Sequence, residues 1–116
     1  MIEQLHELRK FFEGYDTRGY EFRRQQLQKL KAAILQHEKD LYTGLYADLK
    51  KNEVESWVTE IGFVVAEINY ALKNLKKWMK PKKVSTNLLN FPGESFIYKE
   101  PLGVVLIIGA WNYPLH

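Results

Sequence analysis

The chain has 116 residues, of which 46% are hydrophobic, and a formal net charge of +3. This length suits one small domain or part of a larger one, and so small a positive charge does not indicate a nucleic-acid partner. The absence of cysteine excludes disulfides, thiolate metal sites and a thiol nucleophile within these residues. The first residues lack the pattern of a signal peptide, and the apolar run 103–111 is too short to span a bilayer. We therefore expect a cytoplasmic protein with no membrane segment in this chain.

Residues 1–83 are expected to be helical. Apolar residues three and four positions apart predict a first amphipathic helix over residues 2–12. Turn residues follow this helix, and Asp16 or Thr17 is expected to cap a second one. We expect the second helix to break near residues 37–38, where a third one begins.

The fourth helical segment has the longest apolar stripe, from Val54 to Trp78, and Asn52 is expected to end the helix before it. Pro81 ends the fourth segment, because proline cannot continue the hydrogen-bond ladder. A heptad spacing is typical of a coiled coil or of a helix packed against its own domain, and the width of this stripe favours the second. The lysine cluster at its end, within residues 73–83, fits either a phosphate or membrane surface, or the more usual solvated helix end.

From Val84 onward the pattern indicates short strands. Turn residues around Pro92 precede an alternating stretch at 95–99, so residues 84–100 are expected to form a hairpin or bridging strands. Residues 103–110 form an unbroken apolar run bounded by glycine, which is typical of a parallel strand buried on both faces. Such a strand needs partner strands, and none follows it. We therefore expect an α/β fold that is incomplete in this chain.

The motif GAWNYP, residues 109–114, directly follows this apolar run. A helix is expected to begin near Pro114, which places Asn112 at the carboxyl end of a buried strand, where open α/β sheets bind ligands. The side-chain amide of Asn112 can donate two hydrogen bonds to a carbonyl or a developing oxyanion without changing its charge. Spacing alone leaves a second interpretation open, in which Asn112 only caps the backbone of its own turn.

The remaining polar residues predict no metal or acid–base site. The histidines at 6, 37 and 116 lack metal-ligand spacing, and no glycine-rich phosphate loop is present. The carboxylates of the fourth segment give no support for a paired acid and base; they are Glu53, Glu55, Glu60 and Glu67.

The stretch EPLGVVLIIGAWNYP, residues 100–114, closely resembles the aldehyde dehydrogenase superfamily, in which an EPxGVV strand precedes a W-N-F/Y-P turn. The motif is similar to that of the class 3, fatty-aldehyde-like branch, which favours tyrosine after the asparagine, as at Tyr113. The stretch DLKKNEVESWVTEIGFVVAEINYALKNLKKW, residues 48–78, resembles a helix pair of that branch. The resemblance implies that residues 1–116 are a partial, N-terminal segment of a Rossmann-like dinucleotide-binding domain and cover about a quarter of a family chain.

The same resemblance implies NAD(P)-dependent oxidation of aldehydes to carboxylic acids by a parent enzyme that is a homodimer. Its catalytic cysteine and glutamate would lie after residue 116, so this chain alone is expected to be inactive. Asn112 is implied as the oxyanion-hole donor, and Tyr113 as a neighbour of the aldehyde substrate. NAD or NADP is the implied cofactor, and the implied contacts are Ile108, Gly109, Ala110 and Trp111.

A different class of function remains as the alternative. In it, the chain is a non-catalytic helical interaction module that binds a partner through the 54–79 heptad face and the 73–83 lysine cluster.

Overall fold

The computed structural model describes residues 2–116 and is mostly helical, with one small two-stranded sheet. The α-helices are α1 (Ile2–Glu13), α2 (Tyr20–Gln36), α3 (Glu38–Leu49), α4 (Glu53–Ser56) and α5 (Gly62–Trp78). The π-helical turn η2 (Trp57–Ile61) joins α4 to α5, and the short 3-10 helices are η1 (Asp16–Arg18) and η3 (Leu88–Asn90). The strands are β1 (Lys82–Val84) and β2 (Ser95–Ile97). Within residues 2–116, no helix is both long enough and apolar enough to cross a bilayer.

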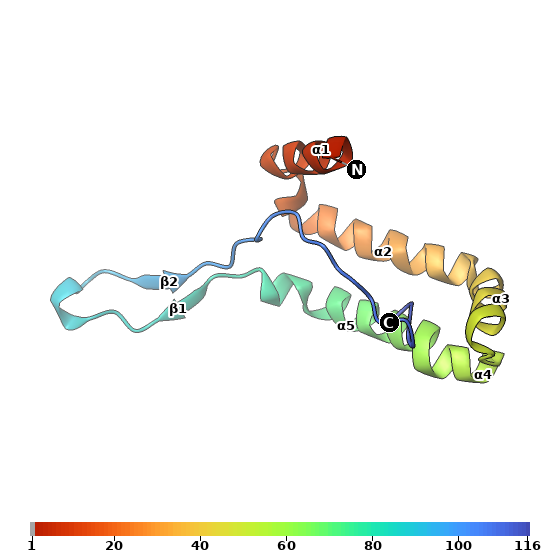
Figure 1. Cartoon of the computed structure of the whole chain (residues 1–116). Helices are drawn as coiled ribbons and strands as arrows, with labels where there is room; N and C mark the ends of the chain where they lie inside the picture. The colour runs from red at the N-terminus through yellow and green to blue at the C-terminus, as the bar shows by residue number, and fades with distance from the viewer. Residues whose placement is uncertain (1) are drawn as a thin grey trace.

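The hydrophobic core lies between α2 and the helical segment from η2 to α5, which run side by side (Figure 1). Its buried members are Ile34 of α2, Ile61 of η2 and Ile68 of α5. The middle of the heptad stripe, at Ile61 and Ile68, is therefore packed against the chain's own α2, as expected for a helix packed against its own domain, whereas Val54 and Val58 are 75% and 64% exposed.

The start of α2 differs from the sequence-based expectation. Neither Asp16 nor Thr17 caps this helix; Gly19 is the N-cap and makes no side-chain cap bond. Asp16 and Thr17 belong instead to η1, and Arg23 of α2 donates from Nε to the carbonyl of Thr17 at 2.9 Å. The connection is thus fixed by a side chain that reaches back from the helix.

The role of Asn52 also differs, because it starts a helix and does not end one. Helix α3 ends before Lys50, which adopts a left-handed conformation with φ 58°. The side-chain oxygen of Asn52 accepts a hydrogen bond from the backbone N–H of Glu55 at 2.9 Å, which is an N-cap for α4.

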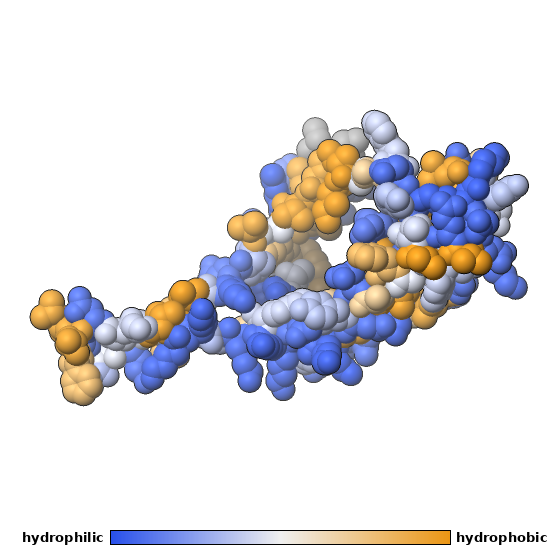
Figure 2. Space-filling model, turned by 90° about the horizontal axis from the view of Figure 1, so that it is seen from below, coloured by the Kyte–Doolittle hydropathy of each residue, from blue (hydrophilic) through white to orange (hydrophobic). Residues whose placement is uncertain are grey.

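Strands β1 and β2 form an antiparallel hairpin that projects away from the helices (Figure 1). The register pairs Lys83 with Phe96. Apolar side chains gather at the tip of this hairpin (Figure 2), where Leu88, Leu89 and Phe91 are at least 82% exposed.

The C-terminal segment returns from the hairpin along the helices (Figure 1), and its conformation differs from the expected buried strand. Residues 103–110 form no strand, and Leu106, Ile107 and Ile108 are 83–86% exposed. A strand forms only where a neighbour completes its backbone hydrogen bonds, and the two strands of the described residues pair with each other. A buried parallel strand at 103–110 stays a prediction for a longer protein that supplies those neighbours.

Candidate functional site

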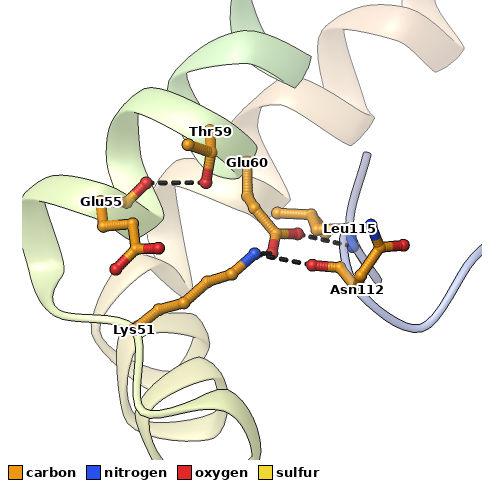
Figure 3. Close-up of polar contacts among 6 residues, drawn as sticks. All are labelled: Lys51, Glu55, Thr59, Glu60, Asn112 and Leu115. Atoms are coloured by element: carbon orange, nitrogen blue, oxygen red, sulfur yellow. Dashed lines mark hydrogen bonds and ion pairs between the residues drawn. The ribbon is translucent and has the colours of Figure 1, made fainter.

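The Asn112 turn, residues 112–115, is held by two charged side chains from the region where α3 passes into α5 (Figure 3). The ammonium nitrogen of Lys51 lies 2.6 Å from Oε1 of Glu60 and donates to the backbone carbonyl of Asn112 at 2.8 Å. The other carboxylate oxygen of Glu60, Oε2, accepts the backbone N–H of Leu115 at 2.9 Å. The turn is therefore bonded at both of its ends.

Both charged groups are withdrawn from solvent. The side chain of Glu60 is fully buried, and that of Lys51 is 10% exposed. A buried charge without a partner is strongly destabilising, so each group depends on the other. Lys51 also lies over the ring of Tyr113, with its ammonium nitrogen 4.1 Å from the ring centroid, which adds a cation–π contact.

Glu60 belongs to the π-helical turn η2 and lies on the inner side of the helix. The backbone N–H of Gly62 donates to the carbonyl of Trp57, five residues earlier, and this spacing defines a π turn. On the outer side, the hydroxyl of Thr59 donates to the carbonyl of Glu55 at 2.8 Å (Figure 3). Single π turns inside α-helices occur often at functional sites.

Asn112 is exposed, and its backbone and side chain face different directions. The backbone carbonyl faces Lys51, whereas the side-chain amide points away from it (Figure 3). Among residues 2–116, that amide has no hydrogen-bond partner, so no bond of the kind expected for a turn-capping asparagine is present. A neutral side-chain amide with free N–H groups can donate to an oxygen that gains negative charge.

Of the other predicted site residues, only Tyr113 belongs to the Asn112 turn. Tyr113 lies within the turn, with its ring against the ammonium group of Lys51. Ile108, Gly109 and Ala110 lie in an exposed segment without regular secondary structure, and Trp111 is exposed where the chain begins to turn. Within the described chain, residues 104–111 make no backbone hydrogen bond. Their N–H and carbonyl groups therefore have no backbone partner there, and Trp111 is 90% exposed.

Lys51 and Glu60 were missed as site residues by the sequence-based interpretation. Lys51 suited a helix end, and Glu60 was grouped with carboxylates that showed no pairing. One signal was available, because Glu60 is three residues after Trp57 and four before Val64, and so shares the apolar face of that helix. A carboxylate at such a position must find a partner when it is buried. No group of three metal-binding side chains occurs among the residues described.

Comparison with known families gives one match that covers nearly the whole chain. Residues 4–116 match the Aldehyde dehydrogenase family. The chain is 47% identical over 115 residues to a 4,4'-diaponeurosporen-aldehyde dehydrogenase of Staphylococcus aureus, and 49% identical over 108 residues to aldehyde dehydrogenase family 3 member H1 of Arabidopsis thaliana. It is 44% identical over 112 residues to a dimeric NADP-preferring aldehyde dehydrogenase of Canis lupus familiaris.

These relatives are much longer than the chain. The alignments cover 93–98% of the chain and 22–25% of the three relatives. A solved structure of the substrate-bound state of Staphylococcus aureus AldH matches 99% of the chain with a TM-score of 0.94 and 46% identity, and the chain covers 25% of it. The fold described above therefore corresponds to about a quarter of an aldehyde dehydrogenase structure.

Proposed function

Since the chain belongs to the aldehyde dehydrogenase family, we propose that it supplies the oxyanion-stabilising part of an enzyme that oxidises aldehydes to carboxylic acids with NAD or NADP. The observation that carries this proposal is the orientation of Asn112. Its backbone is fixed by Lys51, and its side-chain amide has no partner among the described residues and points away from that contact. The whole enzyme would contain further residues, because the chain spans only about a quarter of its relatives.

Asn112 acts in this proposal on the aldehyde oxygen. When a thiolate from the rest of the enzyme adds to the carbonyl carbon, the electron pair of the C=O bond moves to that oxygen, which becomes negative. The amide of Asn112 donates a hydrogen bond to it there, and it does so more strongly than to the neutral carbonyl of the bound aldehyde. Bound NAD or NADP supplies the acceptor for the hydride. As the hydride leaves carbon, the carbonyl forms again as a thioester, which water then hydrolyses to the acid.

The remaining site residues have supporting roles in the proposal. The segment Ile108–Trp111 contacts the cofactor through its free backbone groups, and Tyr113 borders the aldehyde. In the longer enzyme, residues 103–110 become a buried strand of a Rossmann-like parallel sheet. A homodimer is supported by the word "dimeric" in the name of the dog relative, and a cytoplasmic location stays a prediction.

The test compares Asn112→Ala with wild type in a full-length enzyme that contains this segment. Removing one oxyanion donor typically lowers kcat by about 10²–10³-fold. Cofactor affinity is expected to change little, because the backbone groups that contact it remain. Asn90→Ala, which removes an exposed amide of the hairpin, is the matched control. A folded Asn112→Ala enzyme with kcat within about threefold of wild type, far below that range, would contradict the proposal.

A further inference from the structure

We propose that the buried pair formed by Lys51 and Glu60 positions the Asn112 turn, so that the two are positioning residues for the oxyanion donor. The geometric part of this inference concerns the turn alone. Its catalytic part rests on the proposed function of Asn112.

Lys51 and Glu60 use nearly all of their hydrogen-bonding groups on each other and on the Asn112 turn. Both carboxylate oxygens of Glu60 are used, one by Lys51 and the other by the backbone N–H of Leu115. The ammonium group of Lys51 has three N–H bonds. It faces three partners, namely Glu60, the carbonyl of Asn112 and the ring of Tyr113. These contacts join residues that are 55 and 61 positions apart in the sequence.

Stability alone does not account for this arrangement. Replacing a buried ion pair by neutral residues of similar size is often neutral or stabilising, whereas removing one partner is strongly destabilising. The hydrogen bonds of Lys51 and Glu60 are directional, so they specify the position of the turn's backbone. The side chain of Leu115 packs against the core and anchors the turn there. The ion pair adds the bonds that set the orientation of the backbone at Asn112.

The first test measures the turn itself in the 116-residue chain by amide hydrogen exchange. The variants are Lys51→Met, Glu60→Gln and the double variant, and the readout is the Leu115 amide, with the Ile68 amide of α5 reporting global opening. Each single variant is expected to be less stable than wild type, because it leaves one buried group without its partner. The double variant is expected to regain stability, yet its Leu115 amide should still exchange about 10–100-fold faster than in wild type, because the charge-assisted bond is absent.

Matched controls change neighbouring charges that do not touch the turn. Lys50→Met and Glu55→Gln alter exposed residues next to the pair and are expected to leave Leu115 exchange unchanged. The inference is overturned if the stable double variant protects Leu115 as well as wild type does. It is also overturned if Leu115 exchange rises only in parallel with that of Ile68, because the pair then contributes to stability alone.

The second test links position to catalysis in a full-length enzyme that contains this segment. The double variant is expected to lower kcat while leaving cofactor affinity nearly unchanged. In an Asn112→Ala background, the same double change is expected to have little further effect, because both act through one donor. Independent, multiplicative losses would overturn the positioning role in catalysis.

The outcomes also separate this inference from the proposed function. If Asn112→Ala leaves kcat unchanged, the proposed function fails, and the catalytic part of the inference fails with it. The geometric part is then still decided by Leu115 exchange. If Asn112→Ala lowers kcat but the double variant does not, the proposed function stands and the positioning role is refuted.

Discussion

Gly62 donates its backbone N–H to the carbonyl of Trp57, and a Cβ atom at Gly62 would lie 2.8 Å from that carbonyl oxygen and 3.0 Å from the Trp57 indole. Contacts this short between a Cβ and a backbone oxygen require the helix to shift. The π turn that contains Glu60 therefore depends on glycine at this position.

The change Gly62→Ala is expected to destabilise the chain by about 1–3 kcal/mol, as overpacking of a well-packed site does. The matched control is Gly44→Ala in α3, where a Cβ meets no atom within 4 Å. That change is expected to stabilise the helix by up to about 1 kcal/mol, because alanine is the better helix former. Thermal or urea unfolding followed by circular dichroism measures both. Equal effects of the two changes would show that the close contact at Trp57 has no energetic consequence.

Asn52→Ala is expected to lower the free energy of unfolding by about 1 kcal/mol, because it removes the side-chain oxygen that caps α4. Asn52→Asp keeps an accepting oxygen and adds a negative charge at a helix N-terminus, so it is expected to retain wild-type stability. Urea unfolding of the three proteins tests this expectation. If alanine and aspartate destabilise the chain equally, the cap is not the reason.

The hydroxyl of Tyr42 is expected to ionise at a higher pH than an ordinary tyrosine. Its hydroxyl donates to Oε1 of Glu38 at 2.6 Å, and this bond, burial and the nearby negative charges raise the pKa of Tyr42 from 10.0 to about 12. Below pH 10 the hydroxyl is protonated in both the folded and the unfolded chain. Between pH 10 and 12 the unfolded chain loses this proton and the folded chain keeps it, so the stability that Tyr42 contributes falls as the pH rises.

Ultraviolet absorbance of tyrosinate measures this shift directly. The titration of the folded chain should contain a late phase near pH 12, and Tyr42→Phe should delete it. Glu38→Gln should lower the pKa of Tyr42, because it removes the negative charge that opposes ionisation. If Tyr42→Phe leaves the late part of the titration curve unchanged, the expectation is contradicted.

The helices were predictable because their signals are local. The spacing of apolar residues predicted a helix over residues 2–12, where α1 is found, and Pro81 marks the end of the α5 region. The caps were harder to assign from sequence. Asp16 had the right side chain for an N-cap, but Arg23 reaches back to the carbonyl of Thr17 and the helix begins after Gly19 instead.

The remaining differences involve contacts across long sequence separations. Residues 103–110 have the composition of a buried strand, yet strand formation depends on neighbours that composition does not supply. The contacts of Lys51 and Glu60 with the Asn112 turn join residues 61 and 55 positions apart (Figure 3). Periodicity showed that Glu60 shares an apolar face, but it does not reveal which cation the carboxylate meets.

The 116-residue chain is expected to oxidise no aldehyde on its own. The proposed reaction needs a thiolate nucleophile, and the chain contains no cysteine. Incubating the purified chain with NAD⁺ or NADP⁺ and a medium-chain aldehyde, and following reduced cofactor by absorbance, tests this expectation. Turnover that co-purifies with the chain and disappears in Asn112→Ala would refute it.

The chain is expected to associate through the exposed apolar segment that contains Leu106, Ile107 and Ile108. These side chains are 83–86% exposed, and the segment's free backbone groups can pair with a second extended chain. Introducing charge with Ile107→Lys is expected to shift the chain toward monomer, since a charged side chain on an exposed edge opposes pairing.

Sedimentation velocity at several concentrations measures this association. Wild type should show a concentration-dependent rise in mean mass, and Ile107→Lys should reduce it. The hairpin tip offers a second exposed apolar surface, so Leu89→Lys serves as the matched comparison. If Leu89→Lys abolishes association and Ile107→Lys does not, the hairpin tip is the contact. If wild type stays monomeric at every concentration, the exposed segment does not drive assembly.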